Sequence, residues 1–132
     1  TTLESVLDAK TILHYQGILR EVIVRDDLYD YAVRLVRATR ISTEAALPFA
    51  KEWVAWGAGP RACQNLILGA KAQAFFAGRA HITTDDIRAV AKPVLRHRVI
   101  VNYAAAASRI TSDSVVERIV AEIPAPADRV LA

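Results

Sequence analysis

The chain has 132 residues, of which 53% are hydrophobic and 23% are charged, and its formal net charge is +3. This length and composition are typical of one folded domain and exclude a disordered chain. No apolar run approaches the roughly 18 residues that cross a membrane, no secretory leader is recognisable, and the single cysteine fits a reducing compartment, so we expect a cytoplasmic protein without membrane insertion.

The chain contains no methionine, even at its first position. Because translation begins with methionine, we expect the chain to be a piece of a longer protein. Part of its function is then expected to depend on residues outside this sequence.

The first half of the sequence predicts three helices. We expect one from Leu3 to about His14, then an extended connector over residues 21–24. From Asp26 to about Thr39 apolar residues recur at helical spacing, which predicts a helix with one buried face. A shorter helix is expected to start at Pro48 and to carry Trp53 and Trp56, and we expect both indoles to pack in the core.

The second half predicts further helices with well-marked ends. One is expected from Pro60 to about Ala77, with Gly78 ending it.

The next helix start has Thr83 as its cap and Asp86 as an acidic variant of the capping box, with Ile82 and Ile87 as a hydrophobic staple. Pro93 should bend or shorten that helix. The same helix-start pattern recurs later in the chain, with Thr111 as the cap. No alternating pattern suggests a sheet, so the prediction is an all-α fold, a small helical bundle.

The segment from Trp56 to Ala62 is the main candidate for a functional site. Gly59 is expected to cap a helix, with Pro60 at its first position and Arg61 in its first turn. A cation at a helix N-terminus is disfavoured by about 0.3–1 kcal/mol unless both face an anion, most naturally a phosphate. Arg61 therefore either contacts an anion or points sideways into solvent, and spacing alone does not choose between the two.

Other candidate chemical sites have structural explanations. His14, His81 and His97 lie far apart without metal-ligand spacing, so no metal site is expected. Cys63 lies on an apolar helix face, which favours an inert buried thiol over a nucleophile. Helix capping accounts for Asp85 and Asp86. The phosphate-loop pattern G-x-x-x-x-G-K-[ST] is absent, so the chain alone is not expected to bind or hydrolyse a nucleotide.

Several segments resemble one known family in the same order along the chain. Residues 57–62 at the head of a helix, followed by Gly-Ala-Lys-Ala at 69–72 and Gly-Arg at 78–79, resemble the sensor 2 region of the MoxR family of AAA+ ATPases. Residues 82–87 and 94–98 are similar to that family's C-terminal lid, and residues 31–40 to the segment that precedes sensor 2. The resemblance covers roughly residues 1–123 and leaves 124–132 as a C-terminal tail. Gly59 stands where many relatives have serine.

The resemblance implies a helical lid of the AAA+ type, joined to an N-terminal nucleotide-binding domain that holds ATP and Mg²⁺. It also implies a homo-oligomeric, hexameric ring with chaperone-like remodelling activity and partners containing a von Willebrand factor A domain. By this analogy Gly57, Ala58, Gly59, Pro60 and Arg61 bind the nucleotide. Arg61 is then the sensor 2 arginine, the catalytic residue that reaches the γ-phosphate.

Two other functional classes stay open. A basic helical DNA-binding domain should carry clustered Lys and Arg on one helix, but the best-defined helix begins Thr83-Thr84-Asp85-Asp86, which repels phosphate. No nucleic-acid partner is therefore expected. A protein-interaction bundle could use Trp53 and Trp56 as exposed anchors. The sequence does not identify a client protein or the role of residues 96–98.

Overall fold

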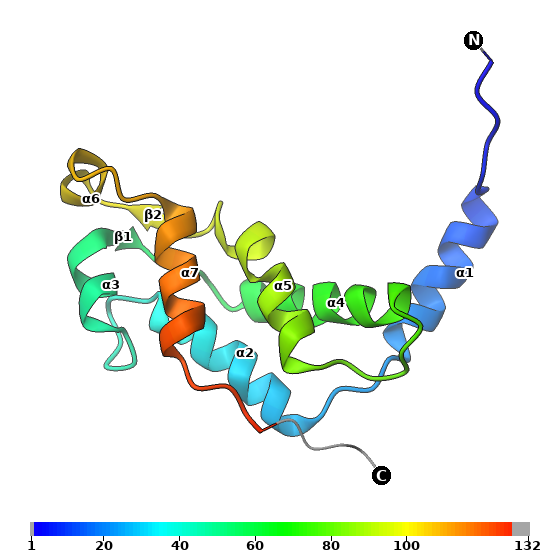
Figure 1. Ribbon diagram of the computed structural model, residues 1–132, viewed down its shortest axis with the longest axis horizontal. Coiled ribbons are helices and arrows are strands. Elements are labelled where there is room, and N and C mark those ends of the chain that lie inside the picture. The colour runs from blue at the N-terminus through cyan, green and yellow to red at the C-terminus, as the bar shows by residue number, and fades with distance from the viewer. Residues whose placement is uncertain (1, 128–132) are drawn as a thin grey trace.

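Four helices form the body of the fold in this computed structural model, which describes residues 2–127. They are α2 (Asp26–Ala38), α4 (Arg61–Phe76), α5 (Thr84–Leu95) and α7 (Ser112–Glu122) (Figure 1). Helix α4 packs along α5 and against α2, and α7 packs on α5 and α2. Within the described residues the remaining helices are α1 (Ala9–Arg20), α3 (Pro48–Trp53) and α6 (Tyr103–Ala107). The predicted all-α class is confirmed.

The core forms where the apolar faces of these helices meet. The helical spacing of α2 predicts a buried face, and all of its positions are buried: Leu28, Tyr31, Ala32, Leu35 and Val36. Helix α4 contributes a face rich in small residues. Small side chains let two helices approach closely. At Gly69 a methyl group would lie 3.2 Å from Cβ of Val90 on α5, so the two helices interlock there.

The predicted capping box of α5 is present. The Thr83 hydroxyl accepts a hydrogen bond from the Asp86 N–H, and the Asp86 carboxylate accepts one from the Thr83 N–H at 2.7 Å. The same carboxylate also accepts two hydrogen bonds from the Arg79 guanidinium, at 2.6 and 2.8 Å. Burial raises the pKa of Asp86, but the bonds from Arg79 and Thr83 outweigh it, so the pKa lies below its ordinary value.

The remaining helix ends follow the sequence closely. Thr111 caps α7 and forms a capping box with Ser114. Gly78 follows α4 with a φ of 70°, the left-handed conformation that glycine adopts without strain. Pro93 lies inside α5, and the helix continues past it to Leu95, so the missing N–H removes one intrahelical hydrogen bond without ending the helix at the proline.

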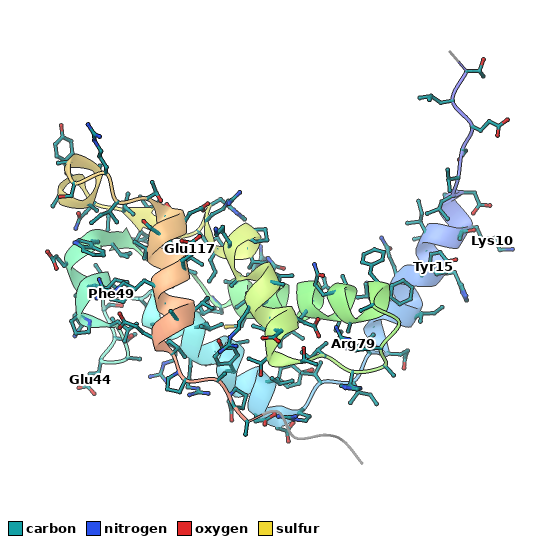
Figure 2. The ribbon with its side chains drawn as sticks, viewed as in Figure 1. Lys10, Tyr15, Glu44, Phe49, Arg79 and Glu117 are labelled. Carbon is teal, nitrogen blue, oxygen red and sulfur yellow. The ribbon has the colours of Figure 1, made fainter. Side chains whose placement is uncertain are left out.

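Helix α1 differs from its prediction. It starts at Ala9 rather than near Leu3, because Asp8 caps it by accepting a hydrogen bond from the Thr11 N–H at 2.7 Å. None of its residues is buried. It packs on the C-terminal half of α4, and the ring of Tyr15, labelled in Figure 2, lies 5.7 Å from that of Phe75.

Two short strands add to the predicted fold. Strand β1 (Val54–Trp56) pairs antiparallel with β2 (Ile100–Val101), and the connector after α1 forms one parallel bridge between Ile23 and His81. The connector is therefore extended, as expected. A sheet of two and three residues per strand is too short to show an alternating pattern in the sequence.

The two tryptophans have different environments. Trp53 is half-buried against the core, and its ring lies 5.7 Å from that of Phe49. The Arg118 guanidinium of α7 covers both rings, 4.2 Å from Phe49 and 5.3 Å from Trp53. Trp56, in contrast, is 72% exposed because it lies on the two-stranded sheet outside the core. The prediction that both indoles are buried is wrong for Trp56.

The C-terminal region follows α7 as an irregular segment. Ile123 and Ala125 still pack against the core, whereas residues 128–132 of the predicted tail, like residue 1, lie outside the described part of the chain. Within residues 2–127 no helix combines the length and the apolar character needed to span a membrane.

Candidate functional site: the loop before helix α4

The loop of residues 57–60 joins β1 to α4 and contains the predicted site. Pro60 already has helical dihedral angles, with φ −58° and ψ −31°, and the Gly59 carbonyl accepts the first hydrogen bond, from the Ala62 N–H at 3.0 Å. The helix therefore begins one residue later than predicted, because Pro60 rather than Gly59 is its N-cap and Arg61 is its first residue. The first turn of α4 contains no acidic side chain.

The loop is fixed to the C-terminal end of α2 through Thr39. The Ala58 N–H donates a hydrogen bond to the Thr39 hydroxyl oxygen at 2.8 Å, and that hydroxyl donates to the Val36 carbonyl at 2.7 Å. Thr39 and Ala58 are both buried. Thr39 lies within residues 31–40, which the resemblance includes, but no role was predicted for it. The available signal is its spacing, since it lies three and four residues after Val36 and Leu35 on the apolar face of α2.

Gly57 lies against the same helix end. A methyl group on its Cα would lie 2.1 Å from the Thr39 carbonyl oxygen and 2.9 Å from the Arg40 Cα. These distances are too short for any side chain, so this close backbone approach requires glycine. At Gly59 the same methyl group would meet no atom within 4 Å.

Arg61 is exposed on the first turn of α4. Within residues 2–127 its guanidinium has no hydrogen bond, ion pair or aromatic contact. The Ala62 and Cys63 N–H groups bond to the carbonyls of Gly59 and Pro60, which satisfies two of the free donors of the helix end. The guanidinium therefore offers stronger anion contacts than the backbone does.

Arg40 adds a second exposed cation beside the loop. It lines a pocket of 320 Å³ together with residues 41–42 and 55–59, so the exposed Trp56 ring and the glycine loop share this space with it. Arg61 is not among the residues that line this pocket. The structure thus brings Gly57, Ala58 and Gly59 together with Arg40, a residue that the sequence did not predict, and places Arg61 at the adjoining helix start.

The other sequence candidates lie elsewhere. Among the described residues no three His, Cys, Asp or Glu side chains are close enough to hold a metal ion. Cys63 is half-buried and lines a largely apolar pocket of 410 Å³ between α1, α2 and α4, and burial raises the pKa of its thiol. Asp86 is engaged in capping, and Asp85 pairs with Arg88 at 3.3 Å.

The AAA lid domain family matches residues 47–119, which include the loop and Arg61. "Chaperone MoxR1" of Mycobacterium tuberculosis is 34% identical over 93% of this chain. The chain is an AAA lid domain of the MoxR type. The lid is also 31% identical, over 74% of its length, to "Protein MoxR" of Paracoccus denitrificans.

A crystal structure shows the same fold. It belongs to a protein from Cytophaga hutchinsonii provisionally described as an ATPase, and it superposes on 89% of the lid with a TM-score of 0.83 and 33% identity. The lid spans about a third of the curated relatives, 33% of the Mycobacterium protein and 30% of the Paracoccus protein, and 36% of the Cytophaga chain. The relatives are therefore about 2.5 to 2.8 times as long as this chain.

Proposed function

We propose that this lid supplies Arg61 as the sensor 2 arginine of a MoxR-type ATPase. In this role Arg61 contacts the γ-phosphate of ATP that a nucleotide-binding domain of the same protein holds with Mg²⁺. The observation that supports the proposal is an exposed guanidinium without a partner in residues 2–127, at a helix start that lacks acidic residues. A guanidinium is permanently charged and presents forked donors that suit phosphate oxygens.

The residues of the lid fit one part of such a site. Arg61 suits the terminal phosphate, and the loop of residues 57–60 is held in place beside it. The sequence has no phosphate loop, and the described residues contain no acidic cluster for Mg²⁺. The nucleotide and its metal would therefore be held by the nucleotide-binding domain, with the lid completing the site.

The packing of the lid suggests how nucleotide state could become motion. Arg61 begins α4, which interlocks with α5 at Gly69 and Val90, and the loop before it is tied to α2. Loss of the γ-phosphate would remove the contact of Arg61 and release the lid as one body. The lid would comprise residues 1–123, with the tail beyond them.

We extend the proposal to the assembly that the resemblance to the MoxR family implies. We expect a cytoplasmic, hexameric ring that remodels other proteins in a chaperone-like way, with partners that contain a von Willebrand factor A domain. The printed name of the Mycobacterium relative, "Chaperone MoxR1", is consistent with such an activity.

The test is ATP turnover by the full-length protein carrying Arg61→Ala. Losing a charge-assisted contact worth about 1.5–3 kcal/mol in the transition state should lower kcat about 10- to 150-fold. Arg37→Ala removes another exposed arginine, on α2, and should leave kcat unchanged. Unchanged turnover in Arg61→Ala would disprove the sensor 2 role. Calorimetry on the lid alone should detect no micromolar binding of ATP.

A further inference from the structure

We infer that Thr39 is a positioning residue for Arg61, and this inference rests on the proposed function. Thr39 ends α2 and holds the loop of residues 57–58 through its hydroxyl and its backbone. The direction of the Arg61 side chain would then depend on the orientation of α2. Nothing in the sensor 2 motif itself contains this connection, because Thr39 lies 19 positions before Ala58.

The hydroxyl of Thr39 is held in one orientation. Its hydrogen is donated to the Val36 carbonyl at 2.7 Å, which leaves a lone pair to accept the Ala58 N–H at 2.8 Å. A threonine side chain is stiff about χ1 because it is branched at Cβ. Since the residue is buried, solvent does not compete for either bond.

The adjacent contact at Gly57 also holds the loop against the end of α2. The loop backbone approaches the Thr39 carbonyl so closely that no Cβ would fit. The loop is thus fixed at two successive residues, by close packing at Gly57 and by a hydrogen bond at Ala58.

Only two residues separate this fixed point from Arg61. Pro60 has its φ locked by its ring, at −58°, and Gly59 is exposed with open space around it. Gly59 is itself tied to α4, because its carbonyl accepts a hydrogen bond from the Ala62 N–H at 3.0 Å. Because α2 buries one complete face in the core, it provides a firm base for that loop.

The experiment uses the full-length protein and the two substitutions Thr39→Val and Thr39→Ser. Valine keeps the shape and loses the acceptor, whereas serine keeps the hydroxyl. Misplacement of a contacting group by about 1 Å can cost about 100-fold, so we expect Thr39→Val to lower kcat about 10- to 100-fold. Thr39→Ser should stay within about twofold of the wild type, because both of its hydrogen bonds remain.

A double variant separates positioning from general destabilisation. If Thr39 acts through Arg61, Thr39→Val should cause no further loss of kcat in the Arg61→Ala background. Val116→Ala, a buried change on α7, is the control for lost stability and should leave kcat unchanged once the protein is folded. If Thr39→Val does not fold, Thr39→Ala removes the same acceptor without placing a methyl group against the polar atoms.

The outcomes are distinguishable. A normal kcat in Thr39→Val, or a further loss of the same factor in the Arg61→Ala background, would overturn the inference while leaving the sensor 2 role intact. An equal loss in Val116→Ala would also overturn it. A normal kcat in Arg61→Ala alone would overturn the proposed function and, with it, this inference.

Discussion

Replacing Gly57 by alanine should destabilise the lid strongly. The added methyl group would lie 2.1 Å from the Thr39 carbonyl oxygen, 0.9 Å inside the 3.0 Å that real Cβ contacts keep. Overpacking of this kind costs about 1–3 kcal/mol. If the loop moves away to relieve the clash, the Ala58 N–H loses its buried acceptor, which costs about 1–3 kcal/mol. Either response therefore predicts a loss of about 1–3 kcal/mol, a substantial share of the roughly 5–15 kcal/mol that stabilises a domain.

The assay is urea denaturation of the lid followed by far-ultraviolet circular dichroism. Gly59→Ala is a matched control two residues away, where the same methyl group meets no atom within 4 Å, and its effect should stay within about 0.5 kcal/mol. The free energy of unfolding should fall in Gly57→Ala with little change in the slope against urea. Equal stability of the two variants would refute the close approach of Gly57 to α2.

Two further predictions concern ionisable groups. Asp86→Asn loses the paired hydrogen bonds from Arg79, whose side chain is 33% exposed against 8% for Asp86, and should lower the free energy of unfolding by about 1–3 kcal/mol at neutral pH. The pKa of Asp86 is lowered in the folded state, so the wild type should lose this advantage as the pH falls below about 4 and through the folded pKa. The difference in free energy of unfolding between the wild type and Asp86→Asn should therefore disappear in acid. A difference that does not depend on pH would contradict this. Burial raises the pKa of Cys63, so iodoacetamide should alkylate it severalfold more slowly in the folded lid than in urea at the same pH, and equal rates would contradict its half-buried position.

Local signals predicted the ends of most helices. The capping boxes at Thr83 and Thr111 need only residues three positions apart, so the sequence contains both partners side by side. The apolar spacing of α2 likewise predicted its buried face. The predicted start of α1 near Leu3 is wrong because Asp8 caps the helix, which is an equally local signal.

Contacts between segments that are distant in the sequence could not be predicted from local signals. Strand β1 pairs with a two-residue strand more than forty positions later, and this pairing exposes Trp56. The role of Gly57 depends on Thr39, whose position beneath the loop is set by the packing of α2 on α4. The candidate loop could therefore be found from the sequence, but its anchor and its neighbour Arg40 could not.

The length of α4 has a mechanical consequence. Its 16 residues span about 24 Å, with Arg61 at one end and the Tyr15–Phe75 contact near the other. Because α4 is interlocked with α5 and packs against α2, it would move together with the body of the lid. A tilt of about 10° about its first turn would swing its far end by about 4 Å, and α1 would be carried with it. If Arg61 contacts a phosphate as proposed, a small rotation of the lid about this end would become a larger displacement at the opposite edge of the domain, where α1 meets α4 (Figure 1).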